Sequence, residues 1–178
     1  MALIVTISGS PSQTSRSSLL ARHVGAKLVA EGFTVEGIEV RDLPAEDLLL
    51  ARATAPAISA ALGLIERADG VVIATPIYKA AYSGILKTFL DVMPQFGLAG
   101  KVVLPLATGG SMAHVLAIDY ALRPVLTSLN PLQVVAGLFL WEKHLEKTAE
   151  GGLVIEAGMS KWLDEIVAEF VRSLRRAK

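Results

Sequence analysis

The sequence predicts a doubly wound α/β domain, in which a five-stranded parallel sheet of order 2-1-3-4-5 carries helices on both faces. Short β-branched runs alternate along the chain with segments whose apolar residues recur at three- and four-residue spacing. The first, third and fourth runs are almost wholly apolar, as is typical of parallel strands that are covered on both faces. Because no repeat or linker interrupts the 178 residues, we expect residues 1–178 to form one domain.

The predicted elements follow one another as five strand–helix units joined by right-handed crossovers. Strands are expected at Leu3–Ser8, Thr34–Glu39, Gly70–Thr75, Lys101–Ala107 and Leu132–Leu140. Helices are expected at Ser15–Glu31, Ala55–Ala68, Ser83–Met93, Met112–Leu129 and Ala157–Arg175. Two polar connections, Val40–Thr54 and Trp141–Glu156, are long and contain turn residues, and connections of that length are often functional.

The composition restricts the classes of partner. Lys plus Arg and Asp plus Glu both number 17, so the chain has no excess charge with which to hold nucleic acid or an anionic membrane. It has no cysteine, which excludes disulfides and thiolate metal sites and suits the cytoplasm. No apolar run reaches the roughly 18 residues of a membrane span. The positive mean hydropathy predicts that apolar surface is covered in a homodimer or homotetramer.

The loop after the first strand is rich in hydroxyl side chains and leads directly into a helix. Between Ser8 and Ser18 it carries serines, Thr14 and Arg16. A helix N-terminus presents unpaired N–H groups and a partial positive charge, which favour a phosphate. The loop lacks the glycine patterns of dinucleotide and nucleoside triphosphate sites, so a terminal monophosphate fits it better. The alternative is a serine-rich turn in which Ser15 simply caps the helix.

Two further loops follow the third and fourth strands. They are Thr75–Gly84 and Thr108–Ser111, and in a parallel sheet they lie at the same edge as the first loop, where ligands bind at the topological switch point. Backbone next to Gly109 and Gly110 can approach a planar ring closely, and the segment around Tyr78 can form its apolar wall. The alternatives are an ordinary glycine turn and surface tyrosines. The three loops together predict a site for flavin mononucleotide (FMN).

Three stretches resemble the NADPH-dependent FMN reductase family, and closely its alkanesulfonate-associated members, which supply reduced flavin to a monooxygenase. These stretches are Gly9–Ser18, Ala74–Asp91 and Gly100–Ser111. The resemblance implies a flavodoxin-like fold, FMN and NADPH (or NADH) as cofactors, and an FMNH2-dependent monooxygenase as partner. It also implies a set of FMN-binding residues: Ser10, Ser15, Arg16, Ser17 and Ser18 at the phosphate, the main chain of Pro76, Ile77, Tyr78 and Lys79 at the ring, Ser83 in the same loop, and Thr108, Gly109, Gly110 and Ser111 at the polar edge of the ring.

The fourth predicted helix contains a proline four residues after a tyrosine. Pro124 cannot donate to the carbonyl of Tyr120 and clashes with it, which predicts a local bulge or kink. Bulges of the π type often occur at functional sites. In the related family members a tyrosine here is an apparent one-residue insertion, which implies that Tyr120 stacks across a subunit interface near the flavin. The alternative is a kinked core helix with an incidental tyrosine.

The flavin would supply the redox chemistry, so no catalytic side chain is required. Accordingly, the sequence has no HExxH motif, no nucleophile elbow and no metal-ligand cluster. His114 follows the third loop and is expected either to touch the cofactor or to be solvated. Lys79 is expected either to pair with a cofactor phosphate or to lie free on its loop.

Three functions therefore remain open from the sequence. The first is NAD(P)H-dependent reduction of FMN, with the reduced flavin passed to a monooxygenase in alkanesulfonate sulfur assimilation. The second keeps the flavin bound and reduces a quinone, an azo compound or a metal oxyanion. The third is a flavodoxin-type electron carrier, although such carriers tend to be strongly acidic and this chain is neutral.

Overall fold

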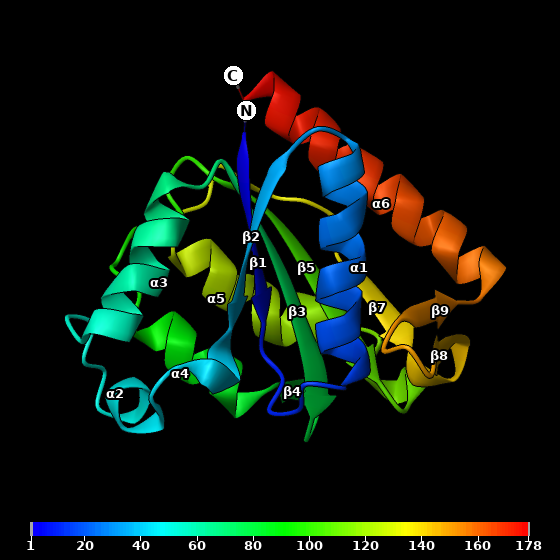
Figure 1. Cartoon of the computed structure of the whole chain (residues 1–178), viewed down its shortest axis with the longest axis horizontal. Helices are drawn as coiled ribbons and strands as arrows, with labels where there is room; N and C mark the ends of the chain where they lie inside the picture. The colour runs from blue at the N-terminus through cyan, green and yellow to red at the C-terminus, as the bar shows by residue number, and fades with distance from the viewer. Residues whose placement is uncertain (1, 178) are drawn as a thin grey trace.

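The computed structural model describes residues 2–177, and a twisted parallel sheet lies at its centre (Figure 1). Strands β2 (Thr34–Glu39), β1 (Leu3–Ser8), β3 (Gly70–Tyr78) and β5 (Val102–Gly109) pair in that order, all parallel. Beyond β5 lie β6 (Gln133–Val134) and β7 (Leu138–Trp141), which both pair with β5 in parallel. The strand order that the sequence predicts is therefore confirmed.

The predicted number of five strands is wrong, because the sheet has seven. One addition is β4 (Ala81–Tyr82), which folds back antiparallel on β3. The other comes from the break of the predicted strand 132–140 into β6 and β7, between which the pairing to β5 shifts by one residue. Pro105 of β5 faces this break and has no N–H to donate across it. A Cβ on Gly137 would lie 2.9 Å from the carbonyl oxygen of Pro105, so the two backbones touch there.

Helices cover both faces of the sheet, as expected. On one face α1 (Arg16–Ala30) and α6 (Ala157–Arg176) bury apolar side chains such as Leu20 and Phe170 against strand residues. On the other face lie α3 (Pro56–Arg67), α4 (Gly84–Asp91) and α5 (Arg123–Ser128), with Ile58, Phe89 and Leu126 in a second apolar cluster. Successive strand residues point to opposite faces, which is why nearly all-apolar strands are needed.

The helix expected at 112–129 is interrupted. It consists of a 3₁₀ turn, η2 (Met112–His114), a π-helical segment, η3 (Ile118–Leu122), and α5. The amide of Arg123 bonds back to the carbonyl of Ile118, five residues earlier. Because Pro124 cannot continue the normal ladder, the backbone absorbs one extra residue before it. The predicted bulge is thus confirmed, and it contains Tyr120.

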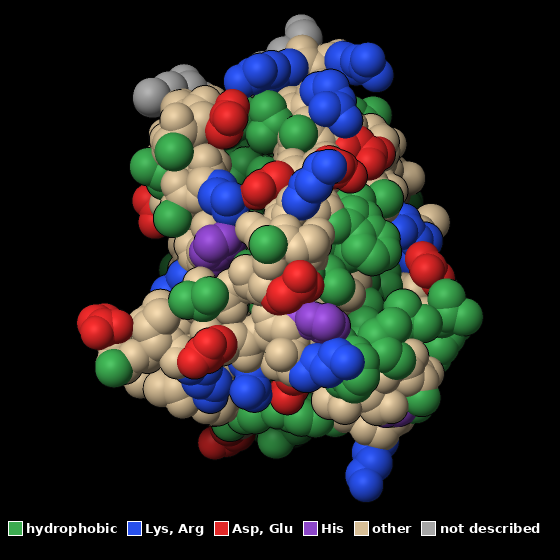
Figure 2. Space-filling model, turned by 90° about the vertical axis from the view of Figure 1, so that its right-hand side faces the viewer, with side chains coloured by type: hydrophobic (Ala, Val, Ile, Leu, Met, Phe, Trp, Pro, Cys, Tyr) green, Lys and Arg blue, Asp and Glu red, His purple; other side chains and the backbone are tan. Residues whose placement is uncertain are grey.

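The two long connections contain short elements that the sequence did not predict. The first holds a 3₁₀ turn, η1 (Val40–Asp42), and helix α2 (Ala45–Leu49). The second holds the 3₁₀ turn η4 (Glu142–His144) and an antiparallel pair, β8 (Leu145–Lys147) and β9 (Leu153–Ile155). None of the helices among residues 2–177 has the length and hydropathy to span a membrane. On the α6 side, acidic and basic side chains are interspersed around apolar patches (Figure 2).

Candidate functional site

Three loops meet at the carboxyl ends of β1, β3 and β5, at the lower edge of the sheet in Figure 1. The amide of Gly9 donates to the carbonyl of Ala74 at 2.9 Å, and the hydroxyl of Ser83 donates to the carbonyl of Gly9. A Cβ on Gly109 would lie 3.6 Å from that of Ile77. The convergence that the sequence predicts is therefore present.

Hydrogen bonds among hydroxyl groups hold the first loop in shape. The Ser15 side chain caps α1 by accepting from the amide of Ser18 at 3.1 Å, so the capping role is real. The buried hydroxyl of Ser18 lies 2.7 Å from that of Ser8. Ser10, also buried, accepts from the amide of Ser12 at 3.2 Å, and the buried hydroxyl of Ser17 lies 3.2 Å from that of Ser15.

Capping leaves anion-binding capacity at the start of α1. Among the bonds of the described residues, none uses the amides of Arg16 and Ser17. No acidic residue stands in the first turn of this 15-residue helix to neutralise its positive end. Two free amides beside several hydroxyls suit a phosphate, so the capped turn and the phosphate site are compatible.

Arg16 has partners that the sequence did not predict. Its Nε donates to the carbonyl of Leu145 at 3.0 Å, and its Nη1 lies 3.3 Å from Oε2 of Glu142. The side chain therefore joins the start of α1 to the connection after β7.

Arg41 is a site residue that the sequence analysis missed. It lies just after β2, and its side chain is only 12% exposed. Its Nη1 donates to Oε2 of Glu39 at 2.7 Å and to the hydroxyl of Ser18 at 3.3 Å. Its position at the carboxyl end of a strand next to β1 was the available signal.

The second loop is a tight hairpin between β3 and β4. Lys79 and Ala80 both have positive φ, 51° and 66°, as a type I′ turn requires. The ring of Tyr78 is half exposed beside this turn, Ile77 is half buried, and Pro76 is buried. Tyr82 pairs with Ile77, and burial raises the pKa of its phenol despite the nearby ammonium of Lys87.

The third loop combines buried strand residues with an open turn. Thr108 and Gly109 are buried, whereas Gly110 and Ser111 are exposed. A Cβ on Gly110 would meet nothing within 4 Å, so the space above this turn is free. The indole Nε1 of Trp141 donates to the carbonyl of Gly110 at 3.1 Å and so fixes the back of the turn.

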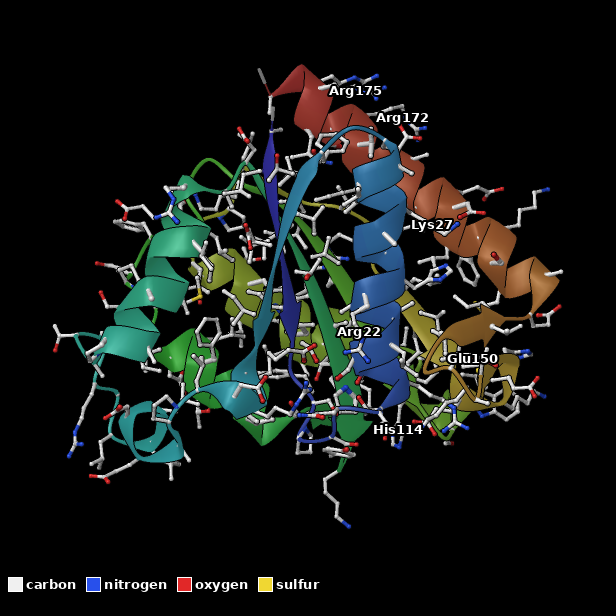
Figure 3. All side chains as sticks on the ribbon, in the orientation of Figure 1. Arg22, Lys27, His114, Glu150, Arg172 and Arg175 are labelled. Carbon is white, nitrogen blue, oxygen red and sulfur yellow. The ribbon has the colours of Figure 1, made fainter. Side chains whose placement is uncertain are left out.

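Tyr120 reaches the hairpin within the same chain. Its hydroxyl donates to the carbonyl of Ala80 at 2.7 Å, while the side chain stays 55% exposed. The expected stacking across a subunit interface stays a prediction. His114 lies at the same lower edge, half buried (Figure 3), and Lys79 is exposed at the hairpin tip.

The chemical groups at this edge suit the binding and positioning of a ligand. Residues 2–177 contain no group of three or more His, Asp or Glu side chains that could hold a metal ion. This edge of the sheet provides amides and hydroxyls in the first loop. It also provides a half-exposed tyrosine in the second loop and an open glycine turn in the third. The fold and the meeting of the three loops together define a flavodoxin-like α/β protein, in which ligands bind at this edge of the sheet.

Comparison with known proteins identifies the family. The model of the NADPH-dependent FMN reductase family matches residues 2–146. An FMN reductase (NADPH) from Pseudomonas putida is 50% identical over 137 residues, which cover 77% of this chain and 70% of the relative. The same named enzyme from Escherichia coli K12 is 48% identical over 136 residues, 76% of this chain and 71% of the relative.

A solved structure agrees with these sequence matches. The apo form of EMOB, an NADH:FMN oxidoreductase, superposes with a TM-score of 0.88 at 41% identity, and the match covers 97% of this chain and 90% of that one. The chain belongs to the NADPH-dependent FMN reductase family. It is therefore an oxidoreductase with FMN and a nicotinamide nucleotide as cofactors.

Proposed function

We propose that this reductase binds FMN at the three-loop edge, reduces it with NADPH or NADH, and passes the reduced flavin to a monooxygenase of alkanesulfonate assimilation. The observation that carries the proposal is the pair of free amides at the start of α1, next to an open turn and a half-exposed tyrosine at the same edge. When bound there, FMN supplies the redox chemistry by accepting a hydride from the nicotinamide.

Each loop has one task in this proposal. The amides of Arg16 and Ser17 and the guanidinium of Arg16 hold the phosphate. The hydroxyls of Ser10, Ser15 and Ser18 shape the turn. The main chain at 76–79 lies along the ring, and the turn at Gly110 and Ser111 meets its polar edge. These backbone groups are fixed before the ligand arrives, so orientation costs little on binding.

The phosphate assignment is tested by titrating FMN and riboflavin into the protein and following flavin fluorescence. We expect FMN to bind more tightly than riboflavin, and Arg16→Ala to weaken FMN binding at least several-fold while the circular dichroism spectrum is unchanged. Lys27→Ala is the matched control, because Lys27 is a cation of the same helix that pairs with Asp164 on α6. Equal binding of both flavins, or an unaltered titration with Arg16→Ala, contradicts the assignment.

Whether reduced FMN leaves the protein as a product is tested by measuring steady-state NADPH oxidation with and without added FMN. Saturable dependence on added flavin supports the proposal. Activity that needs a quinone, an azo compound or a metal oxyanion and no added flavin indicates the second function considered above. Absence of turnover with either nucleotide indicates an electron carrier, which the balanced charge of 17 basic and 17 acidic residues disfavours.

The partner assignment rests on the resemblance to alkanesulfonate-associated members, and reconstitution tests it. The reductase, an FMNH2-dependent monooxygenase, NADPH, FMN, oxygen and an alkanesulfonate are combined, and sulfite is measured. We expect sulfite only when both proteins are present. Normal FMN reduction without sulfite release, under conditions where another flavin reductase supports the same monooxygenase, contradicts this part of the proposal.

A further inference from the structure

The cationic side chain nearest in sequence to the proposed phosphate site is already engaged. Arg16 lies at the first position of α1, yet its Nε bonds to the carbonyl of Leu145 and its Nη1 lies 3.3 Å from Glu142. The two side chains are 34% and 37% exposed, so the ion pair is open to water at one side. A phosphate at the start of α1 has to compete with Glu142 for this guanidinium.

We propose that Glu142 is a positioning residue that weakens the hold on FMN by competing with its phosphate for Arg16. The inference rests on the proposed function, because it requires the phosphate to lie at the start of α1. In this arrangement the guanidinium alternates between a carboxylate of the protein and the phosphate of the ligand. Glu142 thereby keeps the flavin exchangeable, as a reductase that releases its product requires.

The electrostatics of the pair suit a reversible competitor. A partly exposed ion pair stabilises a protein by only about 0.2–1 kcal/mol, which corresponds to roughly a one- to fivefold change in an equilibrium constant. A carboxylate and a phosphate present similar oxygen pairs to the planar guanidinium, so either satisfies it. The competition is therefore weak enough for FMN to bind and strong enough to lower its affinity measurably.

The segment that carries Glu142 is anchored without the ion pair. Trp141 bonds to the carbonyl of Gly110, the ammonium of Lys143 lies 3.6 Å from the centre of the Trp141 ring, and β8 pairs with β9 directly afterwards. The bond from Arg16 to the carbonyl of Leu145 also survives a change at position 142. Removal of the Glu142 charge therefore alters the competition and leaves the segment in place.

The experiment compares FMN dissociation constants and the KM for FMN in Glu142→Gln, Glu142→Asp and Glu146→Gln at low salt. Glu146→Gln is the matched control, because Glu146 is an exposed acid of the same segment with no ion pair among the described residues. We expect Glu142→Gln to lower both constants about two- to fivefold. Glu142→Asp and Glu146→Gln should stay near the wild-type values, and in 0.5 M NaCl the advantage of Glu142→Gln should shrink.

A double variant separates this inference from the proposed function. If Glu142 acts through Arg16, Glu142→Gln added to Arg16→Ala changes FMN affinity no further. Unchanged FMN affinity in Arg16→Ala alone means that the phosphate assignment fails. A second outcome overturns only the competition: Arg16→Ala weakens FMN binding, but Glu142→Gln has the same FMN affinity as the control Glu146→Gln. An effect of Glu142→Gln that persists without Arg16 also overturns it, since the carboxylate then repels the flavin directly.

Discussion

At the scale of single residues, Ser83 ties two of the three loops together. Its buried hydroxyl caps α4 by accepting from the amide of Leu86 at 3.2 Å, and it donates to the carbonyl of Gly9. Ser83→Ala leaves both groups buried without this partner, so we expect a loss of about 1–3 kcal/mol in the free energy of unfolding. Urea titration measures the loss, and FMN affinity should fall with it because the first loop is released.

The control for Ser83 is Ser128→Ala. Ser128 is exposed on α5, and its hydroxyl donates to the carbonyl of Val125 at 2.7 Å, its one hydrogen bond among the described residues. We expect its unfolding free energy to stay within about 0.5 kcal/mol of wild type. If Ser83→Ala is no more damaging than Ser128→Ala, Ser83 does not link the loops energetically.

His23 makes the stability of the α1–α6 contact depend on pH. Burial lowers its pKa below the ordinary 6.5, and Lys27 lowers it further, whereas Asp164 of α6 raises it. Its Nε2 is buried without a hydrogen-bond partner in the part of the chain that the structure describes. The folded protein therefore favours neutral histidine, so this stabilisation is complete above pH 6.5 and is lost as the pH falls through the lowered pKa.

We accordingly expect the thermal unfolding midpoint of the wild type to drop between pH 7.5 and pH 5, and expect His23→Gln to drop less. The comparison uses the slope against pH, because the substitution also alters packing at every pH. His114→Gln is the control, because it removes a histidine that belongs to η2 and not to α1 or α6. Identical slopes for all three proteins would show that His23 does not control the acid response.

The sequence predicted the loops of the site better than the partners of their side chains. Ser15, Ser18 and Gly110 stand where the strand–helix pattern places them. The contact between Arg16 and Glu142 joins residues 126 apart in the chain, and no local pattern encodes such a pairing. Arg41 could have been found from its place after a strand, because every side chain at that edge is a candidate.

At the scale of elements, the close packing of α4 on the first loop is a specific requirement. A Cβ on Gly9 would lie 2.7 Å from the Cβ of Leu86, and that atom cannot move unless the helix backbone moves. We expect Gly9→Ala to displace α4 and to lower the free energy of unfolding by about 1–3 kcal/mol. Chemical denaturation measures the loss, and flavin titration should show weaker binding.

Gly110→Ala is the matched control for Gly9→Ala. A Cβ at this position meets nothing within 4 Å, and the residue has no positive φ. Its unfolding free energy should therefore stay within about 0.5 kcal/mol of wild type. Equal stability of the two alanine variants would mean that the α4 contact tolerates a methyl group and does not constrain the loop.

Periodicity predicted the elements that are long and strongly patterned, and it failed where distant contacts decide. The main strands and α1, α3 and α6 follow from their own residues. The break between β6 and β7 depends on Pro105 of a neighbouring strand, which a local pattern at 132–140 does not contain. The π segment was predictable because its cause, Pro124, lies in the same helix.

At the scale of the whole molecule, the charge and the exposed apolar surface lead to different expectations about binding partners. The net charge is zero, and opposite charges are interspersed on the α6 side (Figure 2), so that side presents no charged patch of one sign to a partner. Apolar side chains are exposed in the segment that follows β5 at the site edge: Met112, Val115, Leu116 and Tyr120 are 48%, 41%, 60% and 55% exposed.

A surface of this kind is expected to be covered by a second copy of the chain, which would bring the subunit interface next to the FMN site. We predict that the protein is a homodimer or homotetramer and that Leu116→Lys shifts it toward the monomer, because burial of an ammonium in an apolar interface is costly. Light scattering after size exclusion measures the mass. Leu49→Lys is the control: Leu49 is 73% exposed on α2, and its substitution should leave the mass unchanged. A monomeric wild type would show that there is no such interface, and equal masses for the two variants would place the interface elsewhere. In either case Tyr120 would contact only the hairpin of its own chain.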